Sequence, residues 1–334
     1  MRFTLSYVVR FTTVLLFSLQ LLANDTFVTL GAGGLIPVRT TQIVMESERL
    51  QISTREISVL YVFRNTSDAD VDATVAFPLP ALDGATLENS PLQLPSTDPE
   101  NFVDFRVSVD GRSVLPMVEI RAFKNGRDVT NHLRLFVLPV SVLDPHMKNA
   151  IDSLSEEKRE ELEREELIVR DEIQRGKGLP SEEFSWPWWE MRVQYYWRQR
   201  FPSRGTVEVL HTYKPVVGGS YINSSDDGSL VVHQYCGGTR DLAQIQKLRA
   251  QVPKEREPDI DLNEKTIDYI LTTGNNWCGP IRSFSLGIES DTPDDIVLTC
   301  MPGLKRVSPT RYEAHFESFR PNRELDVLIL QANR

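Results

Sequence analysis

Apolar and polar residues alternate most regularly between Glu56 and Pro80, in two segments that a polar turn separates. The first segment carries apolar side chains at alternate positions, namely Ile57, Val59, Tyr61 and Phe63. The second repeats the pattern with Val71, Ala73, Val75 and Phe77. Successive side chains of a strand point to opposite faces, so the pattern predicts two half-buried antiparallel strands. Pro78 and Pro80 end the second strand, because proline has no N–H to donate to a sheet.

Similar alternation recurs along the chain and predicts a β-rich fold. The segments lie at residues 103–109, 191–197, 207–213, 230–236, 284–288, 296–300, 312–316 and 327–330. Asp110-Gly111 is a strong hairpin signal, and Asn223–Ser229 predicts another turn between strands. Turn residues that recur about every 8–12 positions favour β-sandwiches over barrels.

Residues 128–182 depart from this pattern and predict an α-helical insertion. Met147, Ile151 and Leu154 have helical spacing, and Ser155 can cap a second helix that runs to about residue 175. Most residues of this second helix are charged, so we expect a solvated face, with a partner-binding arm as the alternative. A short helix is also predicted near residues 239–250, with Thr239 as its cap.

The N-terminal segment Met1–Ala23 has the features of a secretory signal peptide. Two arginines precede an apolar run at residues 11–22, and a small residue, Ala23, marks a cleavage site. A membrane anchor is the alternative, but a span needs about 20 apolar residues and this run is shorter. We therefore expect export to the periplasm or the medium, with no membrane span after cleavage.

Charge and length narrow the class of protein further. Removing residues 1–23 takes away two of the 37 basic residues and leaves 47 acidic ones, a net charge of −12. This acidic balance, without a basic cluster, argues against nucleic acid as a partner. The remaining chain exceeds what one core usually organises. We predict two immunoglobulin-like β-sandwich domains at residues 24–127 and 183–334, with the charged helical insertion at 128–182 between them.

Three cysteines, Cys236, Cys278 and Cys300, lie in the last third of the chain. In an oxidising compartment two of them are expected to pair. We favour Cys236–Cys300, because each ends an alternating segment; whether Cys278 is free or paired stays open. No CxxC or HxxxH spacing occurs, so neither a metal site nor a cofactor is expected.

Aromatic residues supply the candidate ligand contacts. Trp186, Trp188, Trp189 and Trp277 could stack on a sugar, but for the first three we favour the simpler interpretation that they clamp the insertion onto a sheet. His211 and Tyr213 share a mainly apolar strand face. A core histidine is the simpler interpretation of His211, because no nucleophile or carboxylate stands at a recognisable spacing for catalysis.

Several sequence words together resemble a family of exported bacterial proteins catalogued as domain of unknown function 4424. They are GAGGL at 31–35, MESERLQIS at 45–53, YVFRNTSDADVDATVAFPLP at 61–80, HTYKPVVGGS at 211–220 and YILTTGNNWCGPI at 269–281. The resemblance implies an envelope or secreted location and a β-rich fold, and it carries no catalytic residue, cofactor or substrate. It also places Cys236 and Cys300 where the family has cysteines, whereas Cys278 is an addition of this chain.

Three functional classes follow from the sequence. The first is a non-catalytic binding or structural protein of the cell envelope, with an envelope protein or a glycan as its partner. The second is a glycan-binding module that uses the tryptophan-rich segment. The third is a hydrolase with an unfamiliar site around His211. We expect the first, because export and sandwich domains coincide with the lack of catalytic spacing.

Overall fold

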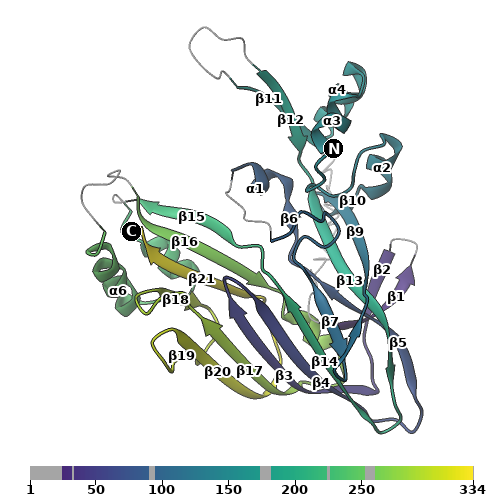
Figure 1. Cartoon of the computed structure of the whole chain (residues 1–334), viewed down its shortest axis with the longest axis vertical. Helices are drawn as coiled ribbons and strands as arrows, with labels where there is room; N and C mark the ends of the chain where they lie inside the picture. Colours follow the sequence, from purple (N-terminus) through teal and green to yellow (C-terminus); the bar gives the residue numbers. More distant parts are fainter. Residues whose placement is uncertain are drawn as a thin grey trace, which may run out of the picture.

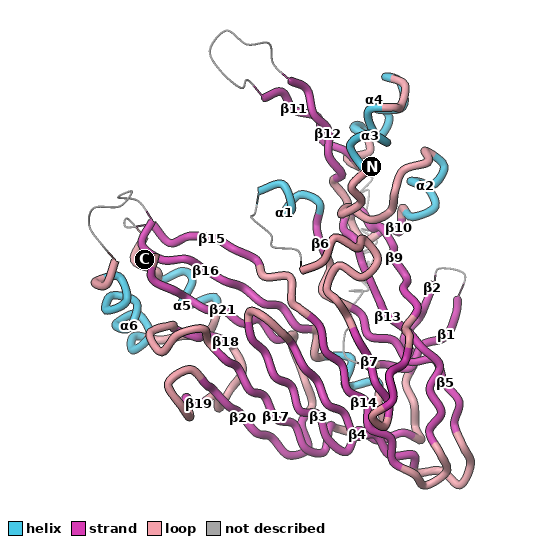
Figure 2. Tube along the Cα trace, in the orientation of Figure 1, coloured by secondary structure: helices cyan, strands magenta, loops and turns pink. Residues whose placement is uncertain are grey.

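The computed structural model describes residues 25–31, 34–89, 95–173, 182–223, 226–252 and 260–333, and these form a mainly β structure (Figures 1 and 2). The strands are arranged in sheets of eight, seven, four and two strands. The predicted signal peptide, residues 1–23, lies outside the described residues. No helix in the described ranges is long and apolar enough to cross a membrane.

The eight-stranded sheet spans the full length of the chain. In spatial order its strands are β19 (Lys305–Arg306), β20 (Arg311–Phe319), β17 (Ile281–Glu289), β3 (Ile43–Ser53), β4 (Ile57–Asn65), β14 (Thr206–Tyr213), β7 (Arg106–Val109) and β8 (Arg112–Val114). The pair β3 and β17 is parallel, and the other pairs are antiparallel. The predicted hairpin at Asp110-Gly111 is confirmed as the turn between β7 and β8.

The seven-stranded sheet covers one end of this sheet. Its order is β10 (Arg127–Asp128), β9 (Met117–Lys124), β13 (Glu190–Phe201), β5 (Val71–Pro78), β1 (Thr26–Gly31) and β2 (Gly34–Val38), and β6 (Leu82–Asp83) pairs with β13. The two strands expected at Glu56–Pro80 exist as β4 and β5, but they belong to different sheets. Alternation fixes which face of a strand is buried and leaves its partner open, so pairing β4 with β5 was wrong.

The four-stranded sheet covers the other end and is itself covered by helices. Its order is β15 (Gly218–Asn223), β16 (Ile260–Tyr269), β21 (Leu325–Ala332) and β18 (Ile296–Thr299). Helices α5 (Ser229–Gln234) and α6 (Thr239–Arg249) lie on its outer face and share a small core with it. The strand and hairpin turn predicted around residues 223–236 were therefore wrong. Val232 and Tyr235 are buried three positions apart, which is helical spacing.

The insertion contains less helix than predicted. It holds α2 (Thr130–Leu135), α3 (Met147–Asp152) and α4 (Glu156–Arg164), followed by a hairpin of β11 (Ile168–Ile173) and β12 (Glu182–Pro187). The helix expected to reach residue 175 stops at Arg164. Glu166 has a φ of 56°, which ends the helix, and the β-branched pair Ile168-Val169 favours a strand. Figure 1 shows this hairpin projecting beside α3 and α4.

Two smaller helices, α1 (Gly84–Asn89) and the 3₁₀ helix η1 (Thr272–Asn276), complete the described elements. The predicted helix near 239–250 is confirmed as α6, but its cap is Gly238, not Thr239. The carboxylate of Asp241 accepts the backbone N–H of Gly238 and so satisfies that end of the helix.

A single large core joins strands from both halves of the chain, so two immunoglobulin-like sandwiches are not confirmed. Phe77 of β5 stacks with Phe105, whose ring centroid is 5.2 Å away, and Phe105 stacks with Tyr195 of β13 at 4.4 Å. Because β13, β14 and β17 pair with β5, β4 and β3, the strands on either side of the insertion interleave within the same sheets.

Candidate functional site

A cleft with a volume of about 230 Å³ opens where β16 passes the chain segments that follow β5 and β14. One wall is apolar and is formed by Leu79, Leu82, Phe102, Val103, Tyr213 and Val216. Strand β16 contributes Thr266 and Asp268 to the other side. Gly218, which also lines the cleft, lets β15 pack closely against β16, because a Cβ at that position would lie 2.3 Å from Thr266 Oγ1.

The cleft continues into a polar cavity of about 240 Å³ that Thr266 and Asp268 also line. This second part is bounded by Gln234, Tyr235, Cys300 and Asp326. Asp268 and Asp326 are directly opposite each other on β16 and β21, where antiparallel strands bring Cβ atoms to within about 5 Å. We call Asp268 and Asp326 the carboxylate pair. The cleft therefore runs from an apolar wall to the carboxylate pair.

The carboxylate pair lies at one end of a sheet face whose other end is apolar and covered by α5 and α6, with Glu264 and Thr266 between the two ends. Leu262 of β16 and Leu328 of β21 point to that face and are buried under α5 and α6. The same alternation places Asp268 and Asp326 on the face, where both are exposed. The same sheet face therefore forms a buried core where α5 and α6 cover it and a wall of the cleft where they do not.

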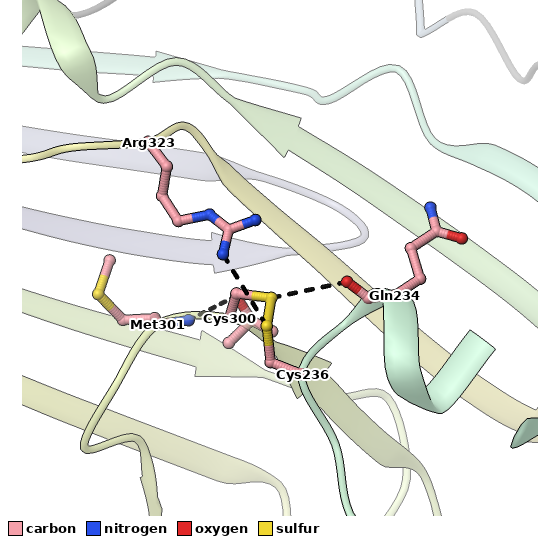
Figure 3. The surroundings of a disulfide bond; sticks show 6 residues. Gln234, Cys236, Cys300, Met301 and Arg323 are labelled. Carbon is pink, nitrogen blue, oxygen red and sulfur yellow. Dashed lines mark hydrogen bonds between the residues drawn. A yellow bond between two sulfur atoms is a disulfide. The ribbon is translucent and has the colours of Figure 1, made fainter. Parts of the chain in front are cut away.

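A disulfide fixes the helix end that borders the cleft. Cys236 follows α5 and Cys300 follows β18, and their bond confirms the predicted pairing, with Cys278 left free. Figure 3 shows the bond beside Gln234 and Arg323, whose guanidinium lies 3.9 Å from Cys236 Sγ. Since Cys300 and Gln234 line the cavity, the disulfide holds one rim of the cleft in place.

The electrostatics of the cleft are dominated by carboxylates. Although part of Asp268 is exposed, the protein around its carboxyl group displaces water, and this loss of solvation, followed by repulsion from Asp326, raises the pKa of Asp268 to about 6. Burial and the nearby carboxylates, Asp268 first, raise the pKa of Tyr235 to about 12. At neutral pH the cleft therefore presents negative charge beside an apolar wall. Such a surface suits a ligand that carries a cation next to an apolar body.

His211, the predicted candidate base, lies deep in the core. It is 0% exposed and its Nε2 is 3.4 Å from Oδ1 of Asp25, which is also 0% exposed. Aromatic rings surround the imidazole, with Phe77 at 4.8 Å and Trp197 at 5.3 Å between centroids. Burial lowers the pKa of His211 to about 3, so the imidazole is neutral. His211 is not among the residues that line the cleft or the polar cavity.

The other predicted ligand contacts divide into buried and partly exposed residues. Trp189 and Trp277 are 0% and 3% exposed, and each donates its indole N–H to a backbone carbonyl, of Val140 and Asp25 respectively. Trp186 and Trp188 are half-buried on or beside β12, with ring centroids 6.3 Å apart. Glycan binding stays a prediction that rests on these two. Tyr213 is the predicted contact that lines the cleft.

Sequence reasoning missed the acidic residues that the fold gathers. Glu48 is 1% exposed and raises the pKa of Asp25 electrostatically, after burial itself. Glu48 had a signal, because it shares parity with the apolar Leu50 and Ile52 on β3. Asp268 and Asp326 had none, since their proximity depends on strand register. No group of three or more metal-ligating side chains occurs among the described residues.

Comparison with solved structures found a distant likeness. A crystal structure from Legionella pneumophila subsp. pneumophila str. Philadelphia 1, described as a "putative nutrient binding protein", is 18% identical in sequence. The match covers 88% of this chain and 68% of that chain, with a TM-score of 0.42. A search of curated proteins found no match.

Family comparison gives a clear result. The sequence profile of the family described as Domain of unknown function (DUF4424) matches residues 23–328. That range includes all residues that line the cleft and its polar cavity, and both cysteines of the disulfide. It also contains the sequence words that suggested the family. This chain belongs to the DUF4424 family.

Proposed function

We propose that the protein is an exported, non-catalytic binding protein that holds a small organic cation in the cleft. The main observation in support of this function is the carboxylate pair at the end of a cleft with an apolar wall. Carboxylates provide a charge-assisted acceptor for an ammonium group, and the apolar wall shields the adjoining hydrocarbon from water. The described lining contains no histidine, and its cysteine is held in the disulfide, which favours binding over catalysis.

Export is supported by two observations. Residues 1–23 have the pattern of a signal peptide. The disulfide is typical of proteins that fold in oxidising compartments. A periplasmic or secreted location is consistent with both, and it would give the cleft access to ligands outside the cytoplasm.

The head group of the ligand can be tested with three probes of similar length. We expect n-hexylammonium to bind in isothermal titration calorimetry, 1-hexanol to bind more weakly, and hexanoate to show no binding. The double variant Asp268→Asn/Asp326→Asn should weaken hexylammonium binding roughly tenfold, because it removes charge-assisted hydrogen bonds. Asp72→Asn, an exposed substitution on β5, serves as the matched control and should bind normally.

The same titration has a defined pH dependence. Asp268 has a pKa of about 6, so it loses its charge between pH 7.5 and pH 5. Hexylammonium affinity should fall over that interval in the wild type and change less in Asp268→Asn. Equal binding of all three probes, or unaltered affinity in the double variant, would rule out cation recognition at this site.

A further inference from the structure

We propose that a second site, separate from the cleft, binds a small oxyanion between Arg39 and Arg320. The two arginines line a pocket of about 280 Å³. The remaining lining is polar apart from one proline and consists of Thr272, Asn275, Asn276, Pro321 and Asn322. None of these residues borders the cleft, so the site stands independently of cation binding.

Three segments that are distant in sequence are tied together to form this pocket. The N–H of Thr40 donates to the carbonyl of Asn276 over 3.0 Å, which places Arg39 beside η1. The amide Nδ2 of Asn275 donates to the carbonyl of Pro321 over 2.7 Å, which places Arg320 on the other side. The two arginines are therefore carried by backbone that is already fixed before a ligand arrives.

Further contacts hold η1 itself in place. The carboxylate of Glu324 accepts the backbone N–H groups of Leu271 at 2.6 Å and Thr272 at 3.0 Å. The Nδ2 of Asn276 donates to Thr26 Oγ1 over 3.0 Å, which connects η1 to β1. The carboxylate of Glu324 is thus hydrogen-bonded to the backbone of η1 and of the residue before it. Glu324 does not line the pocket, so its negative charge is not part of the pocket surface.

The charge of the pocket contrasts with that of the molecule. The whole chain carries a formal net charge of −10. Within the described ranges, Arg39 and Arg320 form no ion pair, whereas Arg64 and Arg282 flank Glu46 and Arg311 contacts Glu289 and Glu313. Two guanidinium groups that face one pocket without a carboxylate partner leave positive charge for a ligand to neutralise.

The chemistry of guanidinium selects the ligand class. Its planar fork donates two parallel hydrogen bonds to a carboxylate or a phosphate, which a spherical anion such as chloride does not accept in that way. A pocket of about 280 Å³ accommodates a small anion of this kind. The shared feature of the expected ligands is a negatively charged group with at least two oxygen atoms.

Calorimetric titration of the full exported chain at low salt tests this site. The probes are inorganic phosphate and succinate, with chloride as the spherical control. We expect saturable binding of phosphate, succinate or both. The double variant Arg39→Ala/Arg320→Ala should weaken that binding by at least about tenfold. Arg112→Ala, which removes an exposed arginine on β8, is the matched control and should leave affinity unchanged.

Two further readouts make the outcome decisive. Arg320→Lys keeps the charge and loses the fork, so affinity should fall between those of the wild type and the double variant. Both arginines are exposed, so we expect each variant to keep the unfolding temperature of the wild type. That measurement separates a loss of binding from a loss of fold. Saturable binding that disappears only with Arg39 and Arg320 supports the site. No binding of either oxyanion, or binding that the double variant retains, overturns it, whatever the cleft does.

Discussion

Asp25 and His211 are two ionisable residues whose side chains are fully buried in the protein. Neither carboxylate oxygen of Asp25 and neither ring nitrogen of His211 has a hydrogen-bond partner within the described chain, apart from their 3.4 Å approach to each other. Burial, followed by the charge of Glu48, raises the pKa of Asp25 well above its ordinary value. A protonated Asp25 beside a neutral imidazole avoids the large cost of an isolated buried charge.

This state predicts how Asp25 affects stability as a function of pH. A raised folded-state pKa gives stability that is complete below the unfolded pKa and is lost as pH rises above it. Asp25→Asn mimics the protonated acid, so its unfolding free energy, measured between pH 5 and 7, should gain on the wild type by up to about 1.4 kcal/mol per pH unit for as long as the folded wild type keeps Asp25 protonated. Urea denaturation at three pH values measures this, with Asp72→Asn as the exposed control.

The opposite result has a clear meaning. If the difference between wild type and Asp25→Asn is constant across that range, Asp25 is already ionised in the folded protein at pH 5. The pair with His211 would then be a buried ion pair, and the neutral state described here would be wrong.

At the scale of elements, the disulfide joins a helix end to a strand end across a loop of 64 residues. Cys236 has a φ of 60°, an uncommon value for a residue with a side chain, so this turn requires support from its surroundings. The disulfide supplies this support, and it also holds Gln234 and Cys300 at the rim of the cleft.

Removing the disulfide should therefore affect both stability and binding. Closing a loop of this length contributes about 4 kcal/mol in the chain-entropy model. Cys236→Ala/Cys300→Ala should lose roughly this amount in guanidinium denaturation and bind hexylammonium more weakly. Cys278→Ala is the matched control, because Cys278 forms no disulfide. A double variant as stable as the control would show that the rim is held by packing of α5 instead.

At the scale of the whole molecule, the strands of the two expected domains interleave. Residues 183–334 contain β13, β14 and β17, whose neighbours β5, β4 and β3 lie before residue 80. A chain cut at the insertion would expose these strand edges together with half of the main core.

We therefore expect residues 183–334 expressed alone to remain unfolded. Circular dichroism should show little ordered sheet and no cooperative thermal transition, while the full chain unfolds in one. The physical reason is that the main core gathers buried side chains from both segments, so neither has a complete core. A fragment with dispersed amide resonances and its own transition would show that a separate domain exists after all.

The local pattern of apolar and polar residues predicted well which face of a strand is buried, and predicted poorly which strands pair with each other. The buried faces of β4 and β17 were evident from alternation alone, because side-chain direction is a property of one strand. Pairing depends on residues far away, so the split of β4 and β5 between sheets was not visible. The β-bulge between Met45 and Ser47 changes the parity of β3, so Glu48 shares the buried face with Leu50 and Ile52. The parity of Glu48 was visible in the sequence, whereas the bulge was not.

The candidate sites follow the same division. The cysteine pairing was predictable, because only three pairings of three cysteines exist. The carboxylate pair depends on the register of β16 and β21, and the arginine pocket depends on loops 281 residues apart in the sequence. Both candidate sites lie where strand ends and loops meet, which is where local patterns carry least information.

The parallel pairing of β3 with β17 also limits how early the chain can complete its main sheet during synthesis. Strand β3 is synthesised early, yet the strand that covers its open edge lies more than 220 residues later. The backbone carbonyl of Asp25 likewise accepts the indole N–H of Trp277, which lies 252 residues later in the sequence. Contacts of such long range slow folding and leave strand edges open to other chains. During synthesis this protein should therefore depend on a holding chaperone until its last quarter has emerged.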